Sequence, residues 1–207
     1  MSGAAQSLLI VEDDLALAGY LAAALGDQGY AVRQAHDSTQ ARGVLANLAP
    51  REFPRLVLLD LGLPPQPSTM VEGLALLDEL LRLAPDAKII VLTGQDESAA
   101  ALEAVRRGAF DFLVKPATLD RITQALQRAS LFVREEARLA ESGETRLHLT
   151  ARLGEGPKEA AAAAEEQLLR RTLAESGYNV AEAARRLGMA REHVYYYLNK
   201  YGIQRPV

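Results

Sequence analysis

Three short, unbroken runs of apolar residues stand out in the first half of the chain, at residues 8–11, 56–59 and 89–92. Because these runs do not alternate with polar residues, they are typical of strands that are buried on both faces of a parallel sheet. Residues 30–35 and 110–114 form two weaker runs of the same type. The pattern therefore predicts five strands.

Amphipathic helical patterns lie between the apolar runs. Some of them end at helix-terminating residues, such as Pro85 and Gly108. The alternation of strand and helix predicts a doubly wound α/β sheet, open at its edges, with helices on both faces. We expect the helices at residues 15–25, 39–48, 71–83 and 98–107, and from Thr118 or Leu119 onward.

The last helix of this unit is predicted to be unusually long. If it reaches Ala140 it spans about 33 Å at 1.5 Å per residue, although about a dozen residues would cover the sheet. If the helix runs on past Ser130, its whole apolar stripe would be half-exposed in a monomer, and we expect the stripe to pair two copies of the chain. The alternative is a break near Ser130 followed by a charged linker. The stripe consists of Ile122, Leu126, Ala129, Val133 and Ala140.

A different pattern begins after residue 140. Residues 141–157 contain three glycines and no helical periodicity, so we expect a linker there. Helical patterns follow at residues 158–176, 181–187 and 190–201, with Gly188 in the short turn between the last two. Three helices joined in this way are typical of a helix-turn-helix.

Charge divides the chain near the same place. The net charge is −4, but residues 158–207 carry 8 basic and 6 acidic side chains, whereas residues 1–157 carry 15 and 21. An acidic first part and a mildly basic second part indicate two modules with different partners.

Cysteine usage and hydropathy exclude several classes of protein. The absence of cysteine excludes disulfides, thiol catalysis and thiolate metal sites. No apolar run approaches the roughly 18 residues of a membrane span, and the first residues lack the features of a secretory signal. We therefore expect a cytoplasmic protein with no membrane partner.

Charged and polar residues mark the ends of four predicted strands. Glu12 and Asp13 follow the first strand, Asp60 ends the third, Thr93 ends the fourth and Lys115 follows the fifth. Because the carboxyl ends of parallel strands meet at one edge of the sheet, these side chains should lie together. Clustered carboxylates suit Mg²⁺, and a lysine beside a hydroxyl suits a phosphoryl group. Each residue alone has an ordinary explanation, such as a helix cap, but the combination predicts a site for a metal and a phosphoryl group.

Four motifs contain these residues: Val11-Glu12-Asp13-Asp14, Leu59-Asp60-Leu61-Gly62-Leu63-Pro64, Val91-Leu92-Thr93-Gly94 and Phe112-Leu113-Val114-Lys115-Pro116. Together they make residues 8–128 resemble the receiver domain of two-component response regulators. The resemblance implies a flavodoxin-like, five-stranded parallel sheet with strand order 2-1-3-4-5. It also implies that Asp60 accepts a phosphoryl group from a histidine of a sensor histidine kinase.

The resemblance further implies a ligand set for Mg²⁺. Asp13 and Asp60 would bind the ion directly, together with the backbone carbonyl of Gly62. Glu12 would act mainly through bound water. All four residues belong to the first two motifs.

The resemblance also implies how such a site responds to phosphorylation. Lys115 would pair with the phosphoryl oxygens, with a cis bond to Pro116, and Thr93 would move to donate a hydrogen bond to the phosphoryl group. Phe112 stands where the family has its rotating aromatic residue. Because phenylalanine has no hydroxyl, we expect this ring to favour the buried position in either state.

One loop departs from the receiver pattern. Residues 65–72 intervene between Pro64 and Gly73, where the family usually has a shorter connection. Because this loop would border the phosphorylation site, it could change kinase docking or shield the phosphoryl group. The alternative is a lengthened loop of no consequence, stiffened by its prolines.

The end of the chain carries a second resemblance. Ala183-Ala184-Arg185-Arg186-Leu187-Gly188 is followed by Leu198 and by Tyr201-Gly202-Ile203. These features make residues 168–203 similar to the output domain of Fis-like and NtrC-like regulators. The similarity implies a DNA-binding homodimer, with residues 190–200 as the recognition helix in the major groove.

The implied DNA contacts fall into two groups. Arg191 and His193, near the start of the recognition helix, would reach base edges. Arg185, Arg186 and Lys200 are better placed for phosphates.

Three tyrosines stand in the middle of this helix, where family members often carry basic residues. The hydroxyls of Tyr195 and Tyr196 could bond phosphates, but they would release fewer counterions than arginine or lysine. We expect at least one of the three rings, which include Tyr197, to pack against Leu187 or Leu198 as part of the core.

The predicted organisation is a receiver at residues 1–130, a helical extension and linker at 131–157, and a Fis-type helix-turn-helix at 158–207. The sequence shows no Gly-x-x-x-x-Gly-Lys-Ser/Thr loop, so we expect no central ATPase domain and no enzyme activity. The predicted function is transcription regulation by binding to double-stranded DNA after phosphorylation of Asp60.

Two alternatives stay open. In the first, the helical module at the end of the chain acts by protein-protein interaction or dimerisation instead of DNA binding. In the second, the sheet belongs to a flavodoxin-like enzyme, although Glu12 and Asp13 would repel the phosphate of FMN.

Overall fold

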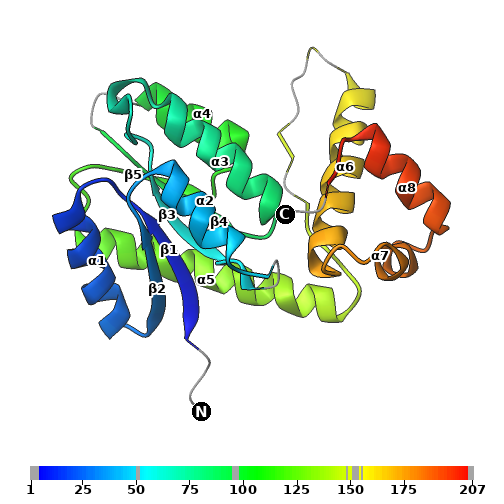
Figure 1. Cartoon of the computed structure of the whole chain (residues 1–207), viewed down its shortest axis with the longest axis horizontal. Helices are drawn as coiled ribbons and strands as arrows, with labels where there is room; N and C mark the ends of the chain where they lie inside the picture. Colours follow the sequence, from blue (N-terminus) through cyan, green and yellow to red (C-terminus); the bar gives the residue numbers. More distant parts are fainter. Residues whose placement is uncertain are drawn as a thin grey trace.

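The N-terminal part of the chain forms a parallel sheet with the strand order β2-β1-β3-β4-β5, as predicted (Figure 1). The computed structural model describes residues 5–49, 52–94, 98–147, 149–150, 154 and 156–204. The strands are β1 (Gln6–Val11), β2 (Tyr30–Ala35), β3 (Leu56–Asp60), β4 (Lys88–Thr93) and β5 (Asp111–Val114). The helices of this part are α1 (Leu15–Asp27), α2 (Ser38–Ala46), α3 (Val71–Leu83), α4 (Ser98–Arg107) and α5 (Leu119–Glu141).

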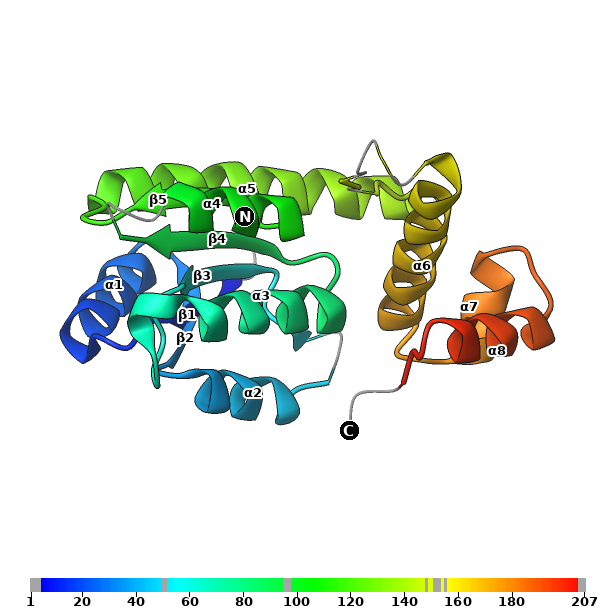
Figure 2. The same ribbon diagram turned by 90° about the horizontal axis from the view of Figure 1, so that it is seen from above.

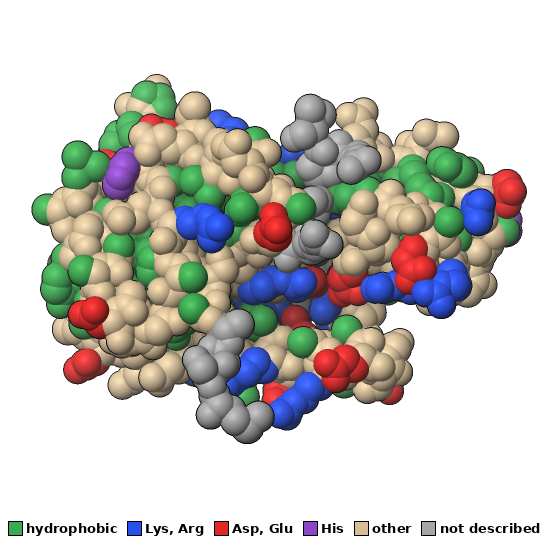
Figure 3. Space-filling model, turned by 60° about the horizontal axis from the view of Figure 1, so that its bottom comes forward, with side chains coloured by type: hydrophobic (Ala, Val, Ile, Leu, Met, Phe, Trp, Pro, Cys, Tyr) green, Lys and Arg blue, Asp and Glu red, His purple; other side chains and the backbone are tan. Residues whose placement is uncertain are grey.

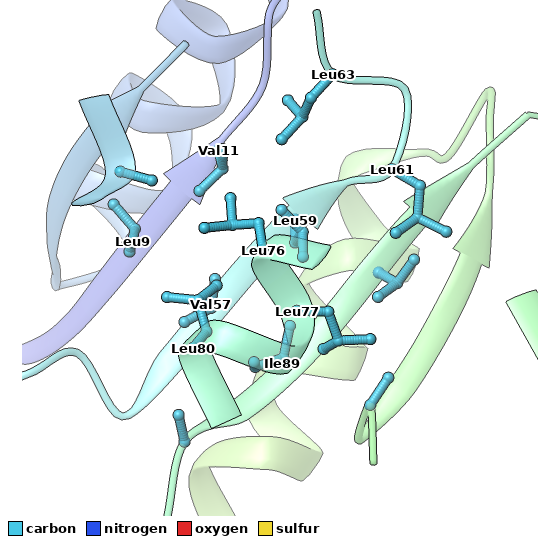
Figure 4. Packing of buried hydrophobic residues seen from close by; sticks show 14 of the residues in the cluster. Leu9, Val11, Val57, Leu59, Leu61, Leu63, Leu76, Leu77, Leu80 and Ile89 are labelled. Atoms are coloured by element: carbon cyan, nitrogen blue, oxygen red, sulfur yellow. The ribbon is translucent and has the colours of Figure 1, made fainter. Parts of the chain in front are cut away.

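Both faces of the sheet are buried, which explains the unbroken apolar runs. In β1, Leu9 and Val11 point to one face, Leu8 and Ile10 point to the other, and all four are fully buried. The first face packs against α2, α3 and α4, and the second against α1 and α5. Figure 4 shows the first of these cores, where α3 packs on the strands.

Helix caps account for some of the polar residues at the strand ends. Asp14 caps α1, because its carboxylate accepts hydrogen bonds from two backbone N–H groups of that helix, at 2.9 and 3.0 Å. Asp37 caps α2 and Thr118 caps α5 in the same way. The role of Asp14 is therefore separate from that of Glu12 and Asp13.

The lengthened loop after β3 is held by one buried side chain. A short 3-10 helix, η2 (Pro67–Thr69), leads into Met70, whose side chain lies in the core. Met70 has a φ of 55°, so the chain turns sharply there before α3 begins. Gly73, in the first turn of α3, lies directly against the backbone of Leu61. The loop is thus anchored beside the strand that carries Asp60, and its effect on kinase docking stays a prediction.

Helix α5 runs without a break for 23 residues and continues beyond the sheet toward the C-terminal helices (Figure 2). This confirms the continuous helix. The expected exposure of its apolar stripe is wrong for Ile122, Leu126 and Ala129, which are buried because the first turns of α5 cover the sheet. Val133 and Ala140 lie farther along and line a cavity beside the C-terminal helices.

The C-terminal helices form a small domain with its own core. They are α6 (Pro157–Glu175), α7 (Val180–Arg186) and α8 (Arg191–Lys200). Gly188, in the turn between α7 and α8, has a φ of 64°, a conformation that favours glycine. The core consists of Leu169, Leu173, Ala183, Ala184, Val194 and Ile203. The predicted helix-turn-helix is therefore confirmed. None of the described helices combines the length and the apolar character that crossing a bilayer needs.

The contact between α3 and β3 gives a stability prediction. In Gly73→Ala, the new Cβ would lie 2.5 Å from the backbone Cα and oxygen of Leu61, so the helix must move away from the strand. We expect a loss of about 3 kcal/mol in the free energy of unfolding, measured by urea denaturation. Gly19→Ala is the matched control, because a Cβ at Gly19 in α1 meets no atom within 4 Å. It should stabilise the protein by about 0.5 to 1 kcal/mol; equal effects at the two positions would contradict the argument.

Candidate functional site

Three carboxylates meet at the carboxyl edge of the sheet. β1 and β3 are adjacent, with Val11 opposite Leu59, so the residues that follow them come together. Glu12, Asp13 and Asp60 each offer an oxygen within 4.8 Å of the others. Glu12 and Asp60 are buried, whereas Asp13 is exposed. The predicted cluster is thus present, with one carboxylate open to solvent and two beneath it.

Lys115 reaches these carboxylates from the end of β5. Its Nζ lies 2.8 Å from Oδ2 of Asp60 and 2.9 and 2.8 Å from the two carboxylate oxygens of Glu12. Burial by itself would lower the pKa of Lys115, but the hydrogen bonds to Asp60 and Glu12 outweigh it and raise the pKa above the usual value. The ammonium is therefore held in its charged form between the two buried carboxylates.

The crowding of charged groups at this edge changes the pKa of Glu12. Burial raises the pKa of Glu12 above its ordinary value, the hydrogen bond from Lys115 lowers it, and the charge of Asp60 raises it again. The net effect is a raised pKa of Glu12, so the single ammonium of Lys115 does not fully compensate the negative charge of the buried carboxylates. A divalent cation would relieve this excess, and three oxygen ligands are the chemistry that Mg²⁺ prefers. The residues present therefore fit the implied metal.

Both carboxylate oxygens of Asp60 have a partner. The backbone N–H of Gly62 donates to Oδ1 at 3.0 Å, and Lys115 donates to Oδ2. These bonds fix the orientation of the carboxylate at the end of β3. The metal-ligand role of the Gly62 carbonyl stays a prediction.

Thr93 lies where the sequence predicts it, at the carboxyl end of β4 and beside the end of β5. Its side chain is buried. Its carbonyl accepts a hydrogen bond from the backbone N–H of Lys115 at 2.7 Å, which ties the two strand ends together. The motion of Thr93 toward a phosphoryl group stays a prediction.

The expectation for Phe112 is wrong in this conformation. Its side chain is 41% exposed, whereas the next residue, Leu113, lies in the core. The reason is geometric: β5 is the last strand of the sheet, and alternation along it places Leu113 inward and Phe112 on the outer side. The lack of a hydroxyl does not by itself bury this ring.

Sequence reasoning missed His36 as a neighbour of the cluster. His36 follows β2, and its Nδ1 lies 3.0 Å from the backbone oxygen of Glu12. β2 is paired in parallel with β1, so a polar residue directly after β2 falls on the same edge. The position of His36 directly after a strand was therefore the sequence feature that could have identified it. The contact fixes the backbone that carries Glu12.

The candidate nucleic-acid interface lies on α8. Arg191, His193, Tyr195 and Tyr196 are all exposed on this helix. Tyr197 is partly buried and packs against the domain core, as expected for one of the three rings. The proposed base-contacting residues are therefore accessible to a ligand, although Arg191 and His193, two positions apart on one helix, point in different directions.

The three side chains proposed to contact DNA phosphates form ion pairs with carboxylates of their own domain. Arg185 and Arg186 both donate to Glu182 one turn earlier, at 2.7 to 3.0 Å. Lys200 lies 3.3 Å from the carboxylate of Glu165 on α6. All three cations are on the surface, so solvent screens these pairs and DNA phosphates can compete for them.

Comparison with known proteins gives two matches along the chain. Residues 8–127 match the response regulator receiver domain, and residues 160–201 match the bacterial regulatory protein, Fis family. Only residues 128–159 lie between the two matched regions, which leaves no room for an ATPase domain there.

Individual relatives agree with these matches. The nitrogen assimilation regulatory protein NtrX of Azorhizobium caulinodans is 37% identical over 136 residues, 65% of this chain and 28% of the relative. The photosynthetic apparatus regulatory protein RegA of Rhodobacter capsulatus is 36% identical over 124 residues, 60% of this chain and 62% of the relative. The chain thus spans less than two thirds of the length of either relative.

A solved structure covers both parts of the chain. It is the crystal structure of a response regulator protein from Burkholderia pseudomallei with a phosphorylated aspartic acid, calcium ion and citrate. The two chains are 33% identical with a TM-score of 0.52, and the match covers 92% of this chain and 96% of that one. The chain therefore belongs to the response regulator receiver family and carries a Fis-family helix-turn-helix after its receiver domain.

Proposed function

We propose that this response regulator is phosphorylated on Asp60 by a sensor histidine kinase and regulates transcription by binding double-stranded DNA. The observation that carries the proposal is the arrangement around Asp60, whose carboxylate is held between the Gly62 N–H and Lys115 at an edge lined by Glu12 and Asp13. A relative with a phosphorylated aspartic acid and a calcium ion supports it.

The proposed reaction transfers a phosphoryl group from nitrogen to oxygen. A carboxylate oxygen of Asp60 attacks phosphorus, an O–P bond forms, and the N–P bond to the kinase imidazole breaks as that ring takes the electron pair. Lys115 then exchanges part of its contact with Asp60 for the phosphoryl oxygens and balances their charge. The hydroxyl of Thr93 supplies a further donor from the end of β4.

Mg²⁺ is the proposed cofactor, and it would supply positive charge to the crowded oxygens. Asp13, Asp60 and the Gly62 carbonyl would hold it directly, and Glu12 would act through water. Asp13 is the exposed member of the set, so it provides the open approach that an exchangeable ion needs.

For the C-terminal domain, we propose α8 as the recognition helix of a homodimer. Arg191 and His193 would read base edges, with Tyr195 and Tyr196 beside them, and Arg185, Arg186 and Lys200 would meet phosphates. The proposed domains are the receiver at 1–130, the extension and linker at 131–157 and the helix-turn-helix at 158–207. Binding to DNA would place the protein in the bacterial cytoplasm.

One observation favours the rival proposal that this domain binds a protein. Arg185, Arg186 and Lys200 are paired with carboxylates of their own domain, so its surface is less basic than the sequence indicates. Salt dependence separates the two functions, because phosphate contacts release counterions from DNA.

Phosphorylation can be tested on the acceptor. With acetyl phosphate and Mg²⁺, we expect Asp60→Asn to abolish incorporation of a phosphoryl group, measured by intact-protein mass, because the nucleophilic oxygen is lost. Asp27→Asn changes an exposed carboxylate at the end of α1 and should react like the wild type. Labelling of Asp60→Asn at the wild-type rate would refute the assignment.

The raised pKa of Glu12 gives a pH prediction. Because this pKa is above 4.5 in the folded protein, the folded state binds the proton more tightly than the unfolded state. The stability that Glu12 contributes is therefore largest below its unfolded pKa and falls as the pH rises through the raised value. Without divalent cations, the unfolding free energy of wild type minus that of Glu12→Gln should decline as the pH rises above about 4.5. Urea denaturation at several pH values measures it, and a constant or rising difference would contradict the argument.

DNA binding can be tested through salt. We expect Arg185→Ala to weaken binding to duplexes of any sequence and to reduce the slope of log affinity against log salt by about one. Arg191→Ala should instead reduce discrimination between sequences. Arg134→Ala, which removes an exposed cation of α5, is the control and should change neither quantity. Salt-independent binding, or none, would favour the protein-binding alternative.

A further inference from the structure

In the part of the chain that the structure describes, the two domains have no common apolar core. The core clusters of the receiver contain no residue of α6, α7 or α8, and the C-terminal core contains none of the receiver. Cavities of ≈650 and ≈440 Å³ lie between the domains, lined by residues from both sides. Apolar packing therefore does not explain why the C-terminal domain lies against the receiver.

A buried ionic contact joins the domains instead. Arg171 of α6 has a side chain only 6% exposed, and its Nε lies 2.7 Å from Oδ1 of Asp86, in the turn before β4. One of its terminal nitrogens lies 3.7 Å from Oε2 of Glu136 on α5. The other donates to the backbone oxygen of Arg146 at 2.7 Å, in the segment between α5 and α6. One guanidinium thus contacts the receiver, the extension of α5 and the segment between α5 and α6, and Glu175 also holds it from its own helix.

The receiver side of this contact is organised by receiver cations. Lys88, at the start of β4, donates to Glu136 at 2.7 Å, and both side chains are 5% exposed. Arg55 donates to Asp86 at 2.6 Å. Two carboxylates are therefore held in place at the amino edge of the sheet, opposite to the phosphorylation site. Figure 3 shows basic and acidic side chains gathered between the two lobes of the molecule.

This contact explains two residues that the fold alone does not require. Lys88 places a charge at the start of a strand whose next four residues are apolar, and Glu136 interrupts the apolar side of α5. The two neutralise each other, and Glu136 also faces Arg171.

Buried ion pairs of this kind contribute little net stability to a contact between domains. Their attraction is offset by the cost of removing the charges from water, and all of these groups regain water when the domains separate. With cavities beside the contact and no common core, the docked and undocked arrangements can be close in free energy. Loss of one partner, by contrast, leaves the remaining charges buried and unbalanced, which favours separation.

We propose that the receiver, together with the extension of α5 that Lys88 holds against it, carries a docking surface for the C-terminal domain of its own chain. This surface is formed by Asp86 and Glu136, and Arg171 is the residue that recognises it. The docked domain forms one wall of the cavity that Val133 and Ala140 line, so it stands where a second copy of the chain would have to approach the far end of α5. Docking and pairing through this end of α5 then exclude each other.

The docking surface is joined to the phosphorylation site by two rigid elements. β4 runs from Lys88 at the docking surface to Thr93 at the site, and α5 runs from its Thr118 cap, three residues after Lys115, to Glu136. A shift of Thr93 or Lys115 therefore moves an element that holds the Arg171 contact. This coupling, unlike the docking itself, rests on the proposed phosphorylation of Asp60.

The test measures the distance between the domains in the full chain. Because the chain has no cysteine, spin labels at Ala46→Cys of α2 and Asn199→Cys of α8, in protein diluted with an excess of unlabelled chains, report one distance within the chain by pulsed electron paramagnetic resonance. We expect one narrow distance in this parent protein. Arg171→Met should replace it with a broad distribution that extends to longer distances. The neighbouring Arg170→Met is the matched control, because Arg170 contacts Glu166 and the Tyr201 carbonyl within the C-terminal domain, and it should keep the narrow distance.

A second variant, on the other side of the contact, keeps the test decisive if Arg171→Met disrupts the fold of α6. Glu136→Gln leaves the C-terminal domain unchanged, and it too should lose the narrow distance. A narrow distance in both Arg171→Met and Glu136→Gln, a broad one in the parent, or equal loss in Arg170→Met would each overturn the docking proposal.

The coupling is tested separately with beryllium fluoride and Mg²⁺, a mimic of a phosphoryl group on aspartate. We expect this addition to broaden the distance in the parent protein but not when Asp60→Asn is also present. An unchanged distance in the parent would overturn the coupling while the docking surface stands. Failure of the proposed phosphorylation itself would be seen independently, as absent labelling by acetyl phosphate.

Discussion

The hydrogen bonds from Lys115 to Asp60 and Glu12 are the interaction on which the candidate site depends. Parallel pairing of β1 with β3 places two carboxylates at the same buried edge, and their mutual repulsion would be severe without a cation. Lys115 supplies that cation from the end of β5, across the intervening strand β4. Its raised pKa keeps it charged, so the same group that allows the carboxylates to be buried is available to a phosphoryl group.

A second lysine has a comparable position at the opposite edge of the sheet. Lys88 begins β4 and neutralises Glu136, much as Lys115 follows β5 and neutralises Asp60 and Glu12. The two edges differ in what else they meet. Asp13 opens the carboxyl edge to solvent, whereas Arg171 of the C-terminal domain closes the amino edge. One sheet thus supports a site for exchangeable ligands at one end and a contact between domains at the other.

The C-terminal domain combines a firm core with a lightly charged surface. Its three helices pack around a small apolar core, and the exposed side of α8 carries tyrosines where a strongly basic helix would carry arginine or lysine. Glu182 and Glu165 hold the surrounding cations in surface ion pairs. Such pairs contribute little to stability. They are therefore well suited to exchange with the phosphates of DNA, which is the function that the family similarity supports.

The sequence by itself was sufficient for the architecture and for the members of the candidate site. A strand that is buried on both faces needs an unbroken run of apolar residues, which is visible in the sequence. Because the strands are parallel, the residues that follow them, Glu12, Asp13, Asp60 and Lys115, then lie at one edge of the sheet. The length of α5 was also readable, because its helical periodicity continues past the sheet. The strands and helices follow from local periodicity, whereas the strand order was an expectation that came from the resemblance to receiver domains.

Only the tertiary structure determines which neighbours each exposed or charged side chain contacts. Ile122, Leu126 and Ala129 were predicted to form a partner surface but cover the sheet, and the Phe112 ring lies outside because β5 is an edge strand. Arg171 gave no signal in the sequence, since an arginine on an amphipathic helix is usually solvated. Its partners Asp86 and Glu136 are far away along the chain. Periodicity shows which side of an element is apolar, but the neighbour of a given side chain is set by how separate elements pack, and that information is not local.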